Sequence, residues 1–172
     1  MKNKISLLIL LISVWSVQLF ANPIDGLLER IDKGASHKFV IELKKGDKDF
    51  FELDQKGKKV VVRGNTYVNI ATGLNWYLKY YAGIHLTWNG MQAKLPDVLP
   101  AVEEKLRKET DLSLRYDFNY CTYSYSMAFW DWERWEKEID WMAMHGINMP
   151  LSITGMEVVW YNLLKRIGYT TE

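Results

Sequence analysis

The spacing of apolar and polar residues predicts two structural units with different architectures. The first begins with three β-rich runs, at residues 37–43, 50–53 and 59–63. Turn-like stretches with the sequences KKGDKD and DQKGK separate these runs. Short strands joined by short turns are typical of an antiparallel meander, so we expect three neighbouring antiparallel strands.

A helix is predicted directly after the third run. Apolar residues at helical spacing run from Ile70 to Tyr81, and Gly83 lies where a C-terminal cap belongs. Residues 84–88 (IHLTW) predict a fourth strand. We therefore expect residues 22–100 to form a small N-terminal α+β domain, in which one helix packs on an antiparallel sheet.

The second unit alternates between strand and helix patterns. It follows residues 101–112, whose charged run EEKLRKE is typical of a surface linker. The predicted elements are, in order, a strand at 114–119, a helix at 131–145, a strand at 147–153 and a helix at 156–167. Strands that alternate with helices predict an α/β fold with parallel strands and right-handed crossovers.

Parallel β/α units of this kind build the (β/α)8 barrel, which takes about 250 residues. The chain has 61 residues after Asp111. We therefore expect residues 113–172 to be the start of an incomplete (β/α)8 barrel. On this interpretation the chain is truncated, and the missing C-terminal part of the same protein would close the barrel.

The first 21 residues have a composition of their own. Lys2 and Lys4 precede an apolar run from Ile5 to Val14, and Ala21 is a small residue at a plausible cleavage point. This order predicts a signal peptide over residues 1–21, and so a secreted or periplasmic protein with no stable membrane insertion after cleavage. The alternative is an N-terminal membrane anchor, for which the apolar run is short.

Charge and cysteine content exclude several functions. The chain has 22 basic and 21 acidic residues, a formal charge of +1, and no basic block, which argues against nucleic acid as a partner. Cys121 is the only cysteine and cannot form an internal disulfide. The three histidines have no metal-ligand spacing, so we expect no metal and no other cofactor.

Polar and ionisable side chains follow the points where the two parallel strands are predicted to end. Active sites of (β/α)8 barrels lie at this end of the strands. The first strand leads to Asn119 and Cys121, and the second leads to Thr154 and Glu157. Residues 115–155 also hold ten of the 24 aromatic residues. Aromatic faces stack on a pyranose and short polar groups fix its hydroxyls, so this end predicts a sugar pocket, although most of the rings fit the core of the first barrel helix.

Three of the four candidate side chains have a structural alternative. Asn119 can hydrogen-bond the local backbone, Cys121 can be a small buried hydrophobe, and Glu157 can cap its helix. Four carboxylates on the predicted helix are expected in solvent: Glu133, Glu136, Glu138 and Asp140. Glycoside hydrolysis uses two carboxyl groups that face each other across the bond, and no such pair can be nominated, so we expect no catalytic residue in this chain.

Several long motifs resemble the α-N-acetylglucosaminidase family, glycoside hydrolase family 89. In the second unit these are NYCTYSYS at 119–126, WDWERWEKEIDWMAMHGIN at 130–148, and the spaced W-Y and G from Trp160 to Gly168. In the first unit, VVVRGN at 60–65 and ATGLNWYLKYYAGIHLTWNG at 71–90 also look like the family. The likeness covers most of the chain after residue 21.

The resemblance implies a short N-terminal α/β domain, a (β/α)8 catalytic barrel and a helical C-terminal domain. It also implies exo-acting removal of terminal α-linked N-acetylglucosamine with retention of configuration. In the family two glutamates from later barrel strands do this without metal, so neither lies in this chain. In the matching N-x-C motif, Asn119 and Cys121 correspond to residues that line the pocket for the terminal sugar.

Two functions from different classes remain open. The first is the N-terminal portion of a secreted α-N-acetylglucosaminidase, inactive by itself, whose partner is a glycan with terminal α-linked N-acetylglucosamine. The second is a non-catalytic module that binds glycans or other domains.

Overall fold

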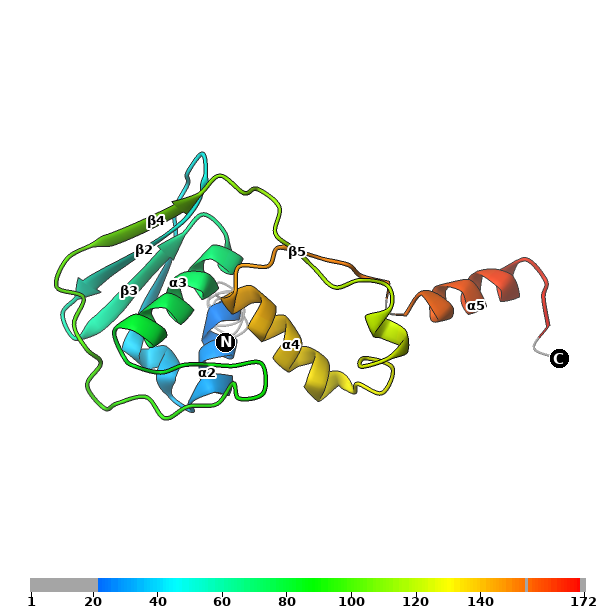
Figure 1. Ribbon diagram of the computed structural model, residues 1–172, viewed down its shortest axis with the longest axis horizontal. Helices are drawn as coiled ribbons and strands as arrows, with labels where there is room; N and C mark the ends of the chain where they lie inside the picture. Colours follow the sequence, from blue (N-terminus) through cyan, green and yellow to red (C-terminus); the bar gives the residue numbers. More distant parts are fainter. Residues whose placement is uncertain (1–21, 154, 171–172) are drawn as a thin grey trace, which may run out of the picture.

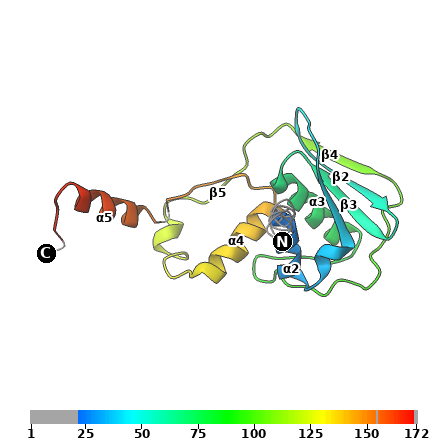
Figure 2. The ribbon, with the colours of Figure 1, turned by 180° about the vertical axis from the view of Figure 1, so that it is seen from behind.

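The computed structural model describes residues 22–153 and 155–170. A four-stranded sheet with helices on one face is followed by a β/α segment whose last helix projects from the rest of the molecule (Figures 1 and 2). The strands are β1 (Phe39–Leu43), β2 (Asp49–Lys56), β3 (Lys59–Gly64), β4 (Leu106–Thr110), β5 (Tyr116–Asp117) and β6 (Met149–Pro150). The helices are α2 (Pro23–Ile31), α3 (Tyr67–Tyr80), α4 (Trp132–Met144) and α5 (Met156–Arg166), with 3-10 turns at Ala35–Lys38 and Thr122–Ser124.

The predicted signal peptide, residues 1–21, lies outside the described residues. Among the helices that the structure describes, none is long and apolar enough to cross a membrane.

The predicted meander is wrong, because the sheet is mixed. Its strand order is β1-β3-β2-β4, with β3 parallel to β1 and antiparallel to β2. Val60, Val61 and Val62 of β3 are all buried. A strand that is apolar on both faces belongs inside a sheet, so β3 takes an internal position between β1 and β2.

The fourth strand also differs from the prediction. Residues 84–88 form a loop whose only pairing is an isolated bridge between Thr87 and Gly90. The fourth strand of the sheet is instead β4, which lies inside the predicted linker and pairs antiparallel with β2 at one edge of the sheet. Its residues LRKET carry charges that suit the solvent-facing edge of a sheet, and such a strand lacks the apolar alternation on which the prediction relied.

Helices α2 and α3 bury their apolar sides against one face of the sheet. The core between them includes Leu28 of α2, Leu53 and Val62 of the sheet, and Leu74 and Tyr77 of α3. Helix α3 is confirmed. Helix α2 was not predicted, although its sequence begins with the Asn-Pro pair that commonly opens a helix.

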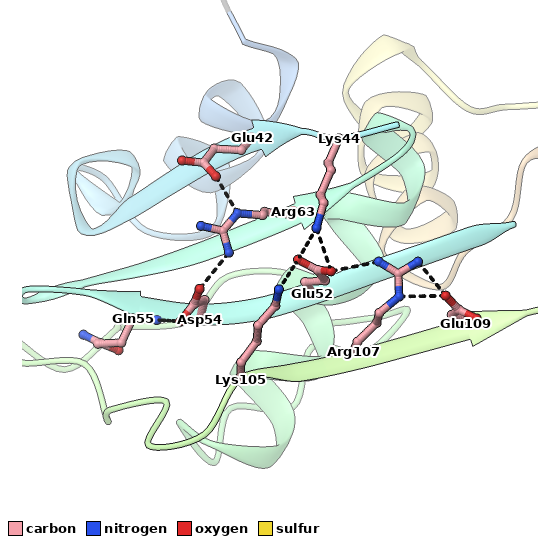
Figure 3. A network of polar contacts seen from close by, with 9 residues as sticks. All are labelled: Glu42, Lys44, Glu52, Asp54, Gln55, Arg63, Lys105, Arg107 and Glu109. Carbon is pink, nitrogen blue, oxygen red and sulfur yellow. Dashed lines mark hydrogen bonds and ion pairs between the residues drawn. The ribbon is translucent and has the colours of Figure 1, made fainter. Parts of the chain in front are cut away.

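A polar network covers the opposite face of the sheet (Figure 3). At its centre, Glu52 of β2 is only 2% exposed and forms ion pairs with Lys44 (3.1 Å), Lys105 (2.9 Å) and Arg107 (2.8 Å). Arg107 also lies over the buried Phe50 ring, 3.7 Å from its centroid. A buried carboxylate is tolerated here because three cations surround it.

The second unit has the predicted order of elements. Helix α4 begins after Asp131, whose side chain accepts a hydrogen bond from the Arg134 amide (2.9 Å). It ends at Met144, two residues before Gly146, where φ is 78°. Strands β5 and β6 pair in parallel as expected, over only two residues each. The described side chains of α5 are exposed.

Helix α4 docks on the first unit through the face that carries Glu138 and Asp140. Its Glu138 and Asp140 are buried, so the prediction that they lie in solvent is wrong, whereas Glu133 is exposed as expected. Arg30 of α2 holds both oxygens of Asp140, at 2.6 and 2.7 Å. Trp88 donates its indole N–H to Glu138 at 2.7 Å. The two units therefore meet through specific polar contacts.

Candidate functional site

The candidate site lies where β5 ends. The strand stops at Asp117 because Phe118 takes a left-handed conformation, with φ of 71°. The Asp117 carboxylate accepts a hydrogen bond from the Phe118 amide at 2.7 Å, which holds the turn in place. A non-glycine residue in this region is uncommon and costs of order 1–3 kcal/mol, and such residues cluster at functional sites. An Asp before a turn is too common in sequences to predict that Phe118 adopts this left-handed conformation.

Asn119 organises the turn that follows. Its side-chain oxygen accepts hydrogen bonds from the amides of Cys121 (2.9 Å) and Thr122 (3.3 Å), and its backbone oxygen accepts one from the Thr122 hydroxyl (2.7 Å). The local-backbone alternative for Asn119 is thus confirmed for the oxygen. Within the described part of the chain, no hydrogen bond involves its amide nitrogen, and the residue is exposed. The N–H groups of that nitrogen are suitable donors to an oxygen-rich ligand.

Cys121 lies in the same turn with an exposed thiol. The alternative that it is a buried hydrophobe is therefore wrong. The reason is local, because Cys121 directly precedes a 3-10 turn, Thr122–Ser124, in which no residue is buried. Asn119 and Cys121 consequently face solvent together at one strand end.

The end of β6 lies beside this turn. The Leu151 amide donates a hydrogen bond to the backbone oxygen of Asp117 at 3.0 Å, and the Tyr123 hydroxyl donates one to the backbone oxygen of Leu151. These two contacts join the two strand ends, and nothing in the spacing of Tyr123 indicated its part. Thr154, predicted to belong to the site, lies outside the described residues. Glu157 is exposed in the first turn of α5, and the described contacts do not join it to Asn119 or Cys121.

Several aromatic rings pack together behind the turn. Tyr123 stacks on Trp135 with centroids 6.2 Å apart, and Trp135 meets Phe118 edge-on at 6.3 Å and Trp130 at 5.0 Å. An apolar cleft between α4 and the β5–β6 pair is lined by Phe118, Tyr123, Trp132, Trp135, Ile139, Met142 and Pro150–Ser152. These rings serve packing, as expected. Other rings on the turn, Tyr120, Tyr125 and Phe129, are exposed.

The acidic side chains beside this turn hold the backbone. Over residues 22–153 and 155–170, no group of three or more His, Cys, Asp or Glu side chains is placed to hold a metal ion. Asp117 and Asp131 are the acidic residues nearest in sequence on either side of Asn119 and Cys121. The Asp117 carboxylate holds the turn at Phe118, and the Asp131 carboxylate caps α4. The geometry fits one wall of a ligand pocket, with polar groups in front of packed aromatic rings.

Two models of one protein family match the chain. The alpha-N-acetylglucosaminidase (NAGLU) N-terminal domain matches residues 22–101, and the alpha-N-acetylglucosaminidase (NAGLU) tim-barrel domain matches residues 115–172. The human protein named alpha-N-acetylglucosaminidase is 47% identical over 112 residues, which is 65% of this chain and 15% of the human one.

Solved structures of a family 89 glycoside hydrolase from Clostridium perfringens are similar over nearly the whole chain. The structure with 2-acetamido-1,2-dideoxynojirmycin is 37% identical with a TM-score of 0.80, and covers 90% of this chain and 19% of that one. The structure with GlcNAc-alpha-1,4-galactose is also 37% identical, has a TM-score of 0.81, and covers 92% and 18%. The chain thus spans less than a fifth of the length of these relatives.

The two family models match adjacent parts of the chain, in the order that the fold suggests. Strands β1 to β3 with α2 and α3 lie in the range of the N-terminal model, and β4 lies between the two matched ranges. The parallel β5–β6 pair with α4 and α5 lies in the range of the barrel model. On these matches the chain belongs to the α-N-acetylglucosaminidase family of glycoside hydrolases.

Proposed function

We propose that this chain forms the N-terminal domain and the first β/α units of an exo-acting α-N-acetylglucosaminidase. The enzyme removes terminal α-linked N-acetylglucosamine from glycans with retention of configuration. The main support is the 47% identity to the human protein of that name. The solved relative that carries GlcNAc-alpha-1,4-galactose supports the same substrate class.

In this proposal the strand end forms part of the wall of the sugar pocket. Asn119 offers the N–H groups of its amide to a sugar hydroxyl or carbonyl, and Cys121 supplies a small surface beside it. Thr154 and Glu157, which follow the neighbouring strand in the sequence, are the other proposed sugar-binding residues. Retaining hydrolysis needs a nucleophile and an acid/base about 5 Å apart, and both glutamates would lie beyond this chain.

We also propose that the protein is exported. The basic start and the short apolar run of residues 1–21 support a cleaved signal peptide, and therefore a secreted or periplasmic site of action.

We expect the 172-residue chain by itself to show no turnover of an aryl α-N-acetylglucosaminide, because no facing carboxylate pair can be nominated from its sequence. The complete gene product should release the aryl group from the α-linked substrate and leave the β-linked one intact. A chromogenic assay of both proteins at equal concentration checks this. Hydrolysis by the 172-residue chain that disappears when one of its own carboxylates is replaced would contradict the proposal.

A second function is favoured by the exposed rings of Tyr120, Tyr125 and Phe129, which a sugar could stack on without any chemistry. This alternative is a non-catalytic glycan-binding module. Titration of the chain with glycans that end in N-acetylglucosamine separates the two. Saturable binding by a stable monomer, together with an inactive complete gene product, favours the module.

A further inference from the structure

Arg115 lies at the junction of the two units, directly before β5. Its side chain is 16% exposed and reaches back to the first unit, where its Nη2 atom lies 2.8 Å from Asp49 Oδ2 and 3.2 Å from Asn69 Oδ1. Asp49 is the first residue of β2, and Asn69 is in the first turn of α3. One guanidinium therefore contacts two elements of the N-terminal core.

These contacts belong to a closed ring of four side chains. Asn65 Nδ2 donates to Asp49 Oδ1 at 3.0 Å, and Asn69 Nδ2 donates to Asn65 Oδ1 at 2.7 Å. Arg115 completes the ring between Asn69 and Asp49. Burial alone would raise the pKa of Asp49, but hydrogen bonds from Asn65, Arg115 and Asn69 lower it, so the carboxylate stays ionised. Both amides use a donor and an acceptor within the ring, which fixes their orientation.

The same residue holds the start of the strand pair. Arg115 Nε donates to the Gly146 oxygen, and Nη1 donates to the Leu112 oxygen at 2.6 Å. The Arg115 amide donates to Asn148 Oδ1 at 2.8 Å, and the Met149 amide donates to the Arg115 oxygen at 3.2 Å. Arg115 thus fixes both the beginning of β5 and the chain that leads from α4 into β6.

The strand pair needs such an anchor because it is short. Strands β5 and β6 are two residues long each, which is too little pairing to hold a fixed position without tertiary support. Asn119 follows Arg115 by four residues, a distance of at most about 13 Å along an extended chain. A shift of the strand at Arg115 therefore moves Asn119 and Cys121 with it.

We propose that Arg115 is a positioning residue for the sugar-pocket wall, which acts by locking the first barrel strand to the Asp49–Asn65–Asn69 ring of the N-terminal unit. Its importance for sugar binding rests on the proposed function. Its role in positioning β5 does not depend on the proposed function and can be measured without any glycan. The N-terminal unit thereby contributes to the sugar pocket, because it positions the strand that leads to Asn119.

Hydrogen exchange in the 172-residue chain tests the positioning. Arg115→Lys keeps the charge but cannot make the forked contacts. We expect exchange of the Leu151 and Cys121 amides to accelerate about tenfold or more, while the Val61 and Val62 amides in the sheet change far less. The matched control is Arg63→Lys, because Arg63 is similarly enclosed (20% exposed) and also holds two elements, through Glu42 and Asp54. Arg63→Lys should leave exchange of the Leu151 and Cys121 amides at the wild-type rate, whatever it does to the neighbouring sheet amides.

Equal acceleration at the strand end and in the sheet would overturn the proposal, because it would mean that Arg115 contributes only to overall stability. If Arg115→Lys does not fold, Asp49→Asn opens the ring from the other side and should give the same local acceleration. In the complete gene product, Arg115→Lys should raise KM for an aryl α-N-acetylglucosaminide more than it lowers kcat, and an unchanged KM counts against the proposal. If the wild-type product is not a glycosidase, the proposed function fails, and the exchange ratio alone decides the positioning role.

Discussion

Replacing Glu52 with Gln should lower the free energy of unfolding by about 3 kcal/mol at pH 7. Burial alone would raise the pKa of Glu52, but hydrogen bonds from Lys105, Arg107 and Lys44 outweigh it and lower the pKa to about 2, from an ordinary value of 4.5. Each pKa unit corresponds to about 1.4 kcal/mol of preference for the ionised form, and Gln resembles the protonated form. The network in Figure 3 would keep three cations and lose the anion at its centre. Urea unfolding at pH 7 measures the change.

The same group predicts how stability depends on pH. A carboxyl whose pKa is lower in the folded protein contributes its full stabilisation above the unfolded pKa, and loses it as the pH falls. The contribution of Glu52 should therefore be complete above about pH 5 and disappear between about pH 4.5 and 2. In Glu52→Gln this part of the acid transition should be missing, while a weaker slope remains from Asp49 and Asp54, whose pKa values are also lowered.

Glu109→Gln is the matched control for Glu52. Glu109 belongs to the same network, but among the described residues its carboxylate forms an ion pair only with Arg107, and it is more exposed, so its replacement should cost clearly less stability. Wild-type stability of Glu52→Gln at pH 7, or an unchanged acid transition, would contradict the account of this network.

Replacing Glu138 with Ala should lower the free energy of unfolding by about 2–3 kcal/mol. The carboxylate is buried between α4 and the first unit, where it pairs with Arg134 at 2.9 Å and accepts the Trp88 indole N–H. Its loss leaves the Trp88 indole N–H and the Arg134 guanidinium without their shared acceptor. Arg134 also lies over the rings of Trp88 and Trp130, so the change should alter tryptophan fluorescence as well. Chemical unfolding followed by that fluorescence measures both effects.

Glu133→Gln provides the comparison on the same helix. Glu133 pairs with Lys137 at the same i,i+4 spacing and the same distance of 2.9 Å, but its side chain is 76% exposed. Exposed pairs of this kind contribute less than about 1 kcal/mol. Equal costs for the two replacements would mean that docking on the first unit does not depend on the buried contact.

The sequence was most informative where local chemistry decides the structure. Helix α3 followed from the helical spacing of its apolar residues, and α4 begins and ends within one residue of the predicted range 131–145. The parallel pairing of β5 and β6 also followed from the alternation of strand and helix patterns. The helices depend on neighbours within a few residues, and the strand pairing follows from the order of the elements along the chain.

Features set by tertiary packing could not be predicted in the same way. The position of β3 depends on which strand needs both faces covered, and β4 is a charged edge strand whose partner lies some 50 residues earlier in the chain. Glu138 and Asp140 look like surface carboxylates on a helical wheel, and only the docking of α2 and the Trp88 loop buries them. In the candidate site, the motif led to Asn119 and Cys121, while the left-handed Phe118 became visible only in the structure.

The central claim is that the end of β5 forms part of the wall of an N-acetylglucosamine pocket. Two variants of the complete gene product test it most directly. Asn119→Ala removes the whole amide, whereas Asn119→Asp keeps an oxygen that can hold the Cys121 and Thr122 amides and removes only the N–H donors. Asn89→Ala, at another exposed asparagine, is the control.

The deciding measurement is kcat/KM for an aryl α-N-acetylglucosaminide, with the melting temperature recorded alongside. We expect both Asn119 variants to lose about tenfold to a hundredfold, the magnitude of one or two hydrogen bonds to the sugar, with the Asn89 variant unchanged. Wild-type kcat/KM in both Asn119 variants, or in Asn119→Asp alone, would contradict the claim, because Asn119 would then only shape its own turn.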